Sequence, residues 1–140
     1  LPALNPDLVI ISLGTNESFD KQSGDQYFAH LDQMIQGIKD KNPQACVLVM
    51  TSPPSVLHRK YKNTYIEKYA ELIGENAHVK NYAVWDLLQV LGGNKAISRN
   101  AAKGYMARDK VHYSKAGYEK QGELFFEAFL QSYELFKSTK

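Results

Sequence analysis

The sequence has little cysteine and no long apolar run, and these shortages exclude several classes of protein. Cys46 is the single cysteine among 140 residues, so the chain can form neither an internal disulfide nor a Cys-x-x-Cys metal site. No stretch approaches the eighteen or so apolar residues of a membrane-spanning helix. The first residues, "LPALNPDL", lack the charged and apolar regions of a signal peptide. We therefore expect neither a membrane span nor a targeting segment in these residues.

The sequence also lacks a large excess of charge of either sign. The formal net charge of +2 comes from 17 basic and 15 acidic residues spread along the chain. Without a basic stripe, we predict that the chain binds neither nucleic acid nor an anionic membrane surface. The 44% hydrophobic and 23% charged residues are typical of globular proteins. The length suits one folded, soluble domain.

Three segments are predicted as strands. "DLVIISL" (7–13) is a continuous apolar, β-branched run, which is typical of a strand buried on both faces in a parallel sheet. "ACVLVM" (45–50) is a second buried strand that contains Cys46 and ends at two prolines. A weaker third strand covers about 79–84.

Helices are predicted from capping residues and apolar periodicity. Ser23 with Gln26, and Thr64 with Glu67, have capping-box spacing. Asp86 caps a short helix, and a last helix starts near Ser114. Apolar spacing predicts the inner face of each longer helix. In the helix after Ser23 it consists of Phe28, Leu31, Ile35 and Ile38, and in the helix after Thr64 of Tyr65, Tyr69, Leu72 and Ile73. In the last helix it consists of Tyr118, Phe125, Phe126, Phe129, Tyr133 and Phe136. The polar stretch 94–113 has no clear period. Alternating strands and helices predict a layered α/β fold with right-handed crossovers.

In such folds ligands bind beyond the carboxyl ends of the strands, so residues that follow strands are informative. Gly14 lets the chain turn sharply after the first strand, and Asn16 can aim an amide N–H into the crevice. Asp109 stands three places before His112, directly ahead of the last helix. An amide donor and an aspartate-supported imidazole are two of the three parts that acyl transfer requires. His30, His58 and His78 have no carboxylate or histidine at ligand spacing, so we predict surface or boundary roles for them and no metal site.

Gly14-x-Asn16 after a buried strand and Asp109-x-x-His112 before the final helix resemble the SGNH, or GDSL-type, esterases and acylhydrolases. "SLGTNESF" and "YMARDKVHYSKAGYEKQGELF" are most similar to the peptidoglycan O-acetylesterase branch. The resemblance implies a three-layer α/β/α sandwich with a parallel, flavodoxin-like sheet. It also implies that residues 1–140 are the C-terminal part of a single SGNH hydrolase domain, incomplete at its N-terminus.

The same resemblance implies serine-type hydrolysis of an O-acetylated glycan, periplasmic or at the cell surface, without cofactor or metal. His112 would act as general base, Asp109 would orient it, and Asn16 would donate to the oxyanion. Gly14, Glu17 and Arg108 are candidate substrate-binding residues. Glu17 could bind a glycan hydroxyl or hold the loop by accepting backbone N–H bonds.

The family's Gly-Asp-Ser block and its oxyanion-hole glycine have no counterpart in the sequence. The nearest string, "SGDQ" (23–26), has Gln26 where the serine belongs. We therefore expect the nucleophilic serine to lie outside this chain, and the chain alone to be inactive. Strand 7–13 would then have an unpaired edge, available to another copy or to an N-terminal segment. The alternative is an inactive SGNH-like carbohydrate-binding or interaction module. A nucleotide binder is disfavoured, because no glycine-rich phosphate loop follows a strand.

Overall fold

A parallel sheet of three strands forms the centre of the computed structural model, which describes residues 4–139. The strands are β1 (Leu8–Ser12), β2 (Cys46–Met50) and β5 (Ala83–Trp85), in the order β1-β2-β5. Both neighbouring pairs are parallel, with Ile10 opposite Leu48 and Val49 opposite Val84. The predicted parallel α/β sheet is thus confirmed.

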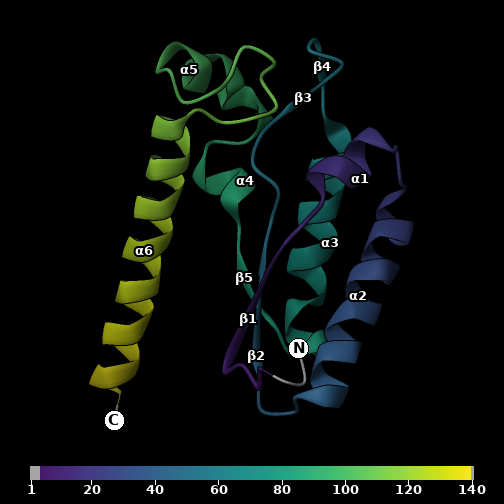
Figure 1. Cartoon of the computed structure of the whole chain (residues 1–140), viewed down its shortest axis with the longest axis vertical. Helices are drawn as coiled ribbons and strands as arrows, with labels where there is room; N and C mark the ends of the chain where they lie inside the picture. Colours follow the sequence, from purple (N-terminus) through teal and green to yellow (C-terminus); the bar gives the residue numbers. More distant parts are fainter. Residues whose placement is uncertain (1–3, 140) are drawn as a thin grey trace.

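Helices cover both faces of this sheet (Figure 1). On one face lie α2 (Gly24–Lys41) and α3 (Thr64–Lys80), and on the other lies α6 (Lys115–Ser138). The three layers match the predicted sandwich. The core between the sheet and the α2–α3 face consists of these buried side chains: Ile11, Tyr27, Leu31, Ile35, Ile38, Val47, Val49, Tyr69, Ile73 and Tyr82. None of the helices in residues 4–139 combines the length and apolarity needed to cross a membrane.

The shorter elements carry the loops of the candidate site. They are α1 (Thr15–Phe19), the hairpin of β3 (Val56–Leu57) and β4 (Tyr61–Lys62), α4 (Leu87–Val90), a 3₁₀ turn (Asn94–Ala96) and α5 (Ile97–Ala102). In Figure 1, α1, the hairpin and α5 gather at the end of the molecule toward which β1 runs. That end is where parallel sheets bind their ligands.

Three of the predicted helix starts are confirmed by their caps. Ser23 Oγ accepts the Gln26 N–H at 3.2 Å, and Asp86 accepts the Gln89 N–H at 3.1 Å. Ser114 Oγ accepts the N–H of Gly117 at 3.1 Å. These bonds satisfy N–H groups that have no partner within the helix.

The capping box predicted for Thr64 and Glu67 is wrong. Asn63 occupies the N-cap of α3, and Thr64 is already helical. The Asn63 amide donates instead to the hydroxyls of Ser18 and Ser55 in the interior, and Glu67 pairs with Lys62 at 2.9 Å. A tertiary network and an ion pair thus take the place of the local cap.

Two further boundaries differ from the prediction. Helix α3 continues to Lys80, so the third strand begins at Ala83 rather than near residue 79. The stretch 94–113, which shows no period, contains α5. This helix is a six-residue segment, too short for its period to stand out from the loops on either side.

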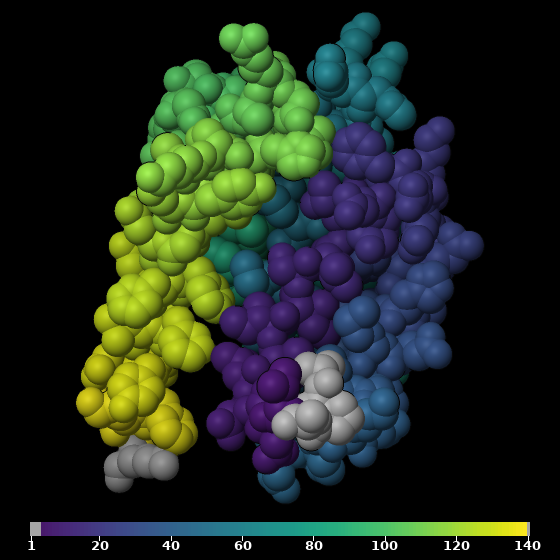
Figure 2. All heavy atoms as spheres, in the orientation of Figure 1, coloured from purple at the N-terminus to yellow at the C-terminus, as the bar shows by residue number. Residues whose placement is uncertain are grey.

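Strand β1 is not buried on both faces, contrary to the sequence prediction. It lies at an edge of the sheet, and Leu8 and Ile10 are 38% and 45% exposed. On α6, Phe125 packs edge-on against Trp85, but Phe126, Phe129 and Tyr133 are more than half exposed. A groove of about 240 Å³ separates α6 from the sheet, visible as the hollow beside the helix in Figure 2. Cys46 is also exposed, at the start of β2.

Candidate active site

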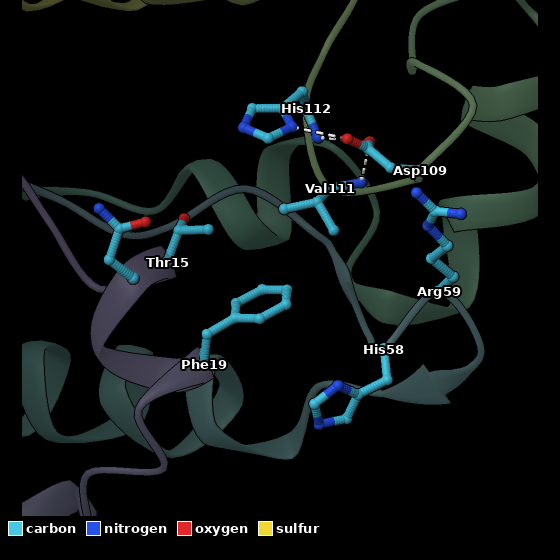
Figure 3. Close-up of a pocket in the computed structure, with 8 residues that line it drawn as sticks. Thr15, Phe19, His58, Arg59, Asp109, Val111 and His112 are labelled. Atoms are coloured by element: carbon cyan, nitrogen blue, oxygen red, sulfur yellow. Dashed lines mark hydrogen bonds and ion pairs between the residues drawn. The ribbon is translucent and has the colours of Figure 1, made fainter.

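Asp109 and His112 form a directly hydrogen-bonded pair in the loop before α6. The Nδ1 atom of His112 lies 2.7 Å from Oδ2 of Asp109. Because an ionised carboxylate can only accept, Nδ1 carries a proton, and in the neutral imidazole the free lone pair is on Nε2. Figure 3 shows that second nitrogen turned away from Asp109. The His112 side chain is 72% exposed, so Nε2 is accessible to a reacting group.

The second oxygen of Asp109 fixes the loop itself. Oδ1 accepts the backbone N–H groups of Val111 at 2.9 Å and His112 at 3.0 Å. The His112 side-chain hydrogen bond, followed by these two backbone bonds, lowers the pKa of Asp109 to about 2. The carboxyl therefore stays ionised over the whole physiological pH range, as an orienting group for an imidazole must.

Contacts with neighbouring segments hold this loop in place. The Tyr113 hydroxyl donates to Pro54 O at 3.0 Å from a buried position. The Val56 N–H of the hairpin donates to Lys110 O at 3.1 Å. Burial raises the pKa of Tyr113, so its hydroxyl stays protonated as the donor. The His112 loop and the β3–β4 hairpin are thus joined through main-chain and side-chain bonds.

The turn after β1 places Asn16 at the start of α1. Gly14 has a φ of 124°, and a Cβ there would lie 2.5 Å from Ser52 Oγ, so only glycine fits. Glu17 accepts the Gly14 N–H at 2.8 Å. This is the loop-holding arrangement, one of the two roles predicted for Glu17, and it occupies the Gly14 donor. The hydroxyl of Ser52 donates to Leu13 O at 3.0 Å and fixes the same turn.

One cavity of about 360 Å³ brings Asn16 together with the Asp109–His112 pair. It is lined by Thr15, Asn16, Phe19, His58, Arg59, Asp109, Val111 and His112. Gly14 and Glu17 line a smaller, adjoining cavity of about 110 Å³ that shares Thr15 and Asn16 with the first. Arg108 is exposed and lines neither of the two.

Besides Thr15 and Val111, which lie within the two motifs, sequence reasoning missed Phe19, His58 and Arg59 of the cavity wall. Phe19 and His58 meet edge to face, with ring centroids 6.4 Å apart, and Arg59 follows His58 at the hairpin tip (Figure 3). The sequence predicts a surface or boundary role for His58 and no role for Arg59. The signal that could have found them was their place after strands: His58 and Arg59 lie two and three residues beyond the "SPPSV" loop that follows β2, and Phe19 lies two residues beyond Glu17.

Residues 1–120 match the GDSL-like lipase/acylhydrolase family. The chain belongs to this family. Its members cleave carboxylic esters, and the site geometry fits that chemistry through an oriented imidazole beside an amide donor. No curated protein sequence matches the chain.

Solved structures of esterases share the fold. A peptidoglycan O-acetylesterase superposes with a TM-score of 0.81 at 23% identity, over 89% of this chain and 37% of that one. A lipase/acylhydrolase from Enterococcus faecalis superposes with a TM-score of 0.67 at 24% identity, over 90% of this chain and 62% of that one. An acetyl xylan esterase superposes with a TM-score of 0.71 at 21% identity, over 91% of this chain and 69% of that one. The chain thus spans between about one third and two thirds of the length of these structures.

The cavity is lined by the Asp109–His112 pair but by no serine among the described residues. Ser18 and Ser55 are fully buried in the Asn63 network, and Ser52 is bound to the β1–α1 turn. Residues 4–139 also contain no cluster of histidine, cysteine and carboxylate side chains suited to a metal ion. Thus the described wall of this cavity combines the hydrogen-bonded Asp109–His112 pair with Asn16 and contains no serine.

Proposed function

We propose that this chain supplies the acid–base pair and one oxyanion donor of a serine-type acetylesterase. His112 Nε2 takes the proton of the attacking serine and returns it to the leaving alcohol oxygen. Asp109 keeps Nδ1 protonated and stabilises the imidazolium, while Asn16 donates to the oxyanion. The observation that carries the proposal is the shared cavity, which Asn16 lines together with the hydrogen-bonded pair.

We further propose that the nucleophilic serine lies outside residues 1–140, within the same SGNH domain. The free edge of β1 supports this, since a parallel strand added there would end beside Asn16. Such a strand would also cover the exposed side chains of Leu8 and Ile10. The substrate we propose is an O-acetylated glycan, met in the periplasm or at the cell surface, in keeping with the acetylesterases that share the fold.

The proposal is tested by assaying the full-length protein on acetylated glycans and on 4-nitrophenyl acetate. We expect acetate release that disappears in the His112→Ala variant. An inactive, glycan-binding module remains the alternative, favoured by the absence of serine from the described cavity wall. That alternative predicts glycan binding without acetate release, with affinity unchanged by His112→Ala.

A further inference from the structure

The tip of the β3–β4 hairpin has an unusual backbone. His58 and Arg59 have φ angles of 49° and 63°, and Lys60 N–H donates to Leu57 O at 3.1 Å. Two positive φ angles at the centre of such a turn define type I′, which strongly favours Asn and Gly. A histidine and an arginine in these positions carry conformational strain. Strained residues of this kind cluster at binding sites, where their side chains are needed.

Both strained residues line the cavity of Asn16, Asp109 and His112. The position of the hairpin is fixed relative to the Asp109–His112 loop, because Val56 N–H donates to Lys110 O in that loop. In Figure 3 the Arg59 side chain extends from the hairpin tip toward that loop. The turn conformation and the anchored hairpin together place the Arg59 guanidinium at the rim of the cavity.

Arg59 forms no ion pair with a carboxylate of the described residues. No ion pair among residues 4–139 involves an arginine. Asp109 is the one carboxylate among the described residues of the cavity wall, and both its oxygens are engaged by His112 and Val111. Across the cavity, Phe19 and Val111 offer apolar surface on which a sugar ring can lie.

We propose that Arg59 binds a carboxylate carried by the acetylated glycan and so makes the site selective for anionic substrates. This inference rests on the proposed esterase function and deepens it. The planar guanidinium fork matches a carboxylate with two parallel hydrogen bonds, which a lysine ammonium cannot do. Two carriers supply such a carboxylate, an acidic sugar and a peptide attached to the glycan, and the test below distinguishes them.

The test compares acetyl esters that differ only in this carboxylate. The full-length protein is assayed on an O-acetylated neutral hexose, on its uronic acid counterpart, and on the neutral hexose linked to an acidic dipeptide. Wild-type protein prefers at least one of the two anionic esters by kcat/KM, and the preferred one identifies the carrier. Arg59→Gln lowers the anionic-to-neutral ratio by roughly 10- to 100-fold, mainly through KM, the size expected for a lost charged hydrogen bond. Arg59→Lys restores only part of the ratio.

Lys60→Gln is the matched control, because Lys60 carries the same charge in the same turn but does not line the cavity. It leaves the ratio within about twofold, apart from a small salt-dependent change. An equal loss in Lys60→Gln, or an unchanged ratio in Arg59→Gln, overturns the proposal. Calorimetric binding of the three deacetylated ligands is measured in parallel. If no acetate is released, the proposed function fails, while loss of anionic-ligand binding in Arg59→Gln still supports the Arg59 site and equal binding refutes it.

Discussion

Nδ1 of His112 lies 2.7 Å from Oδ2 of Asp109, and the other oxygen of that carboxylate accepts two N–H groups of the same loop. One side chain therefore fixes both the backbone and the imidazole tautomer. The first prediction follows from this double role. In the full-length protein His112→Ala lowers kcat on an acetyl ester by several orders of magnitude, and Asp109→Asn by about 10⁴-fold. His78→Ala, which changes an exposed histidine of α3, serves as the control. Near-wild-type turnover in either site variant would place the chemistry elsewhere.

The second prediction concerns Asn16. Replacing it by alanine removes one oxyanion donor and lowers kcat by roughly 10²–10³-fold, with little change in KM. Steady-state kinetics separate the two constants. A rise in KM at unchanged kcat would mean that Asn16 contacts the substrate in its ground state and not the oxyanion.

The third prediction concerns the pKa of Asp109 and the stability of the fold at low pH. Because the folded pKa of Asp109 is lowered to about 2, ionisation of this carboxyl favours the folded state above the unfolded pKa of about 3.9. That contribution is lost as the pH falls from about 4 through about 2. NMR titration of the carboxyl carbon should give a midpoint near pH 2 in the wild-type protein. The midpoint should rise in His112→Ala, since the largest cause of the shift is removed, and an unshifted midpoint would show that the pair does not form.

The fourth prediction uses the strained hairpin tip. Replacing His58-Arg59 by Asn-Gly supplies the residues that a type I′ turn prefers and should raise the free energy of unfolding by about 1–2 kcal/mol. Urea denaturation measures the gain. The same variant should lose the preference for anionic esters. Unchanged stability would mean that the turn carries no strain in solution.

The fifth prediction concerns the free edge of β1. Residues 1–140 expressed alone should self-associate or aggregate, because an unpaired parallel strand with exposed Leu8 and Ile10 is a template for pairing. The isolated chain should also lack esterase activity. Light scattering after gel filtration gives the mass in solution. The Ile10→Lys substitution should reduce self-association. A wild-type chain that remains monomeric and does not aggregate would contradict the prediction.

Local signals in the sequence predicted much of the fold. The apolar runs of β1 and β2 and the caps at Ser23, Asp86 and Ser114 depend on nearby residues, and the structure confirms them. The capping role of Thr64 failed because the long-range contacts of Asn63 determine where α3 begins.

Burial was less predictable, because it depends on which elements cover a surface. The apolar β1 and the aromatic face of α6 have the composition of buried elements, yet Leu8 and Ile10 of β1 and Phe126, Phe129 and Tyr133 of α6 are exposed. For the site, the places of the two motifs along the chain and the resemblance to SGNH esterases led to Asp109, His112 and Asn16, and these residues line one cavity. Arg59 escaped notice because a hairpin with an unfavourable turn sequence is held by a tertiary bond from Val56 to Lys110.

The most direct test of the central claim is to label the full-length protein with a fluorophosphonate, which reacts with activated serines, and to locate the adduct by mass spectrometry. We predict one labelled serine outside residues 1–140, and no labelling in the His112→Ala variant. A labelled serine within residues 1–140, or labelling that persists without the His112 imidazole, would contradict the account.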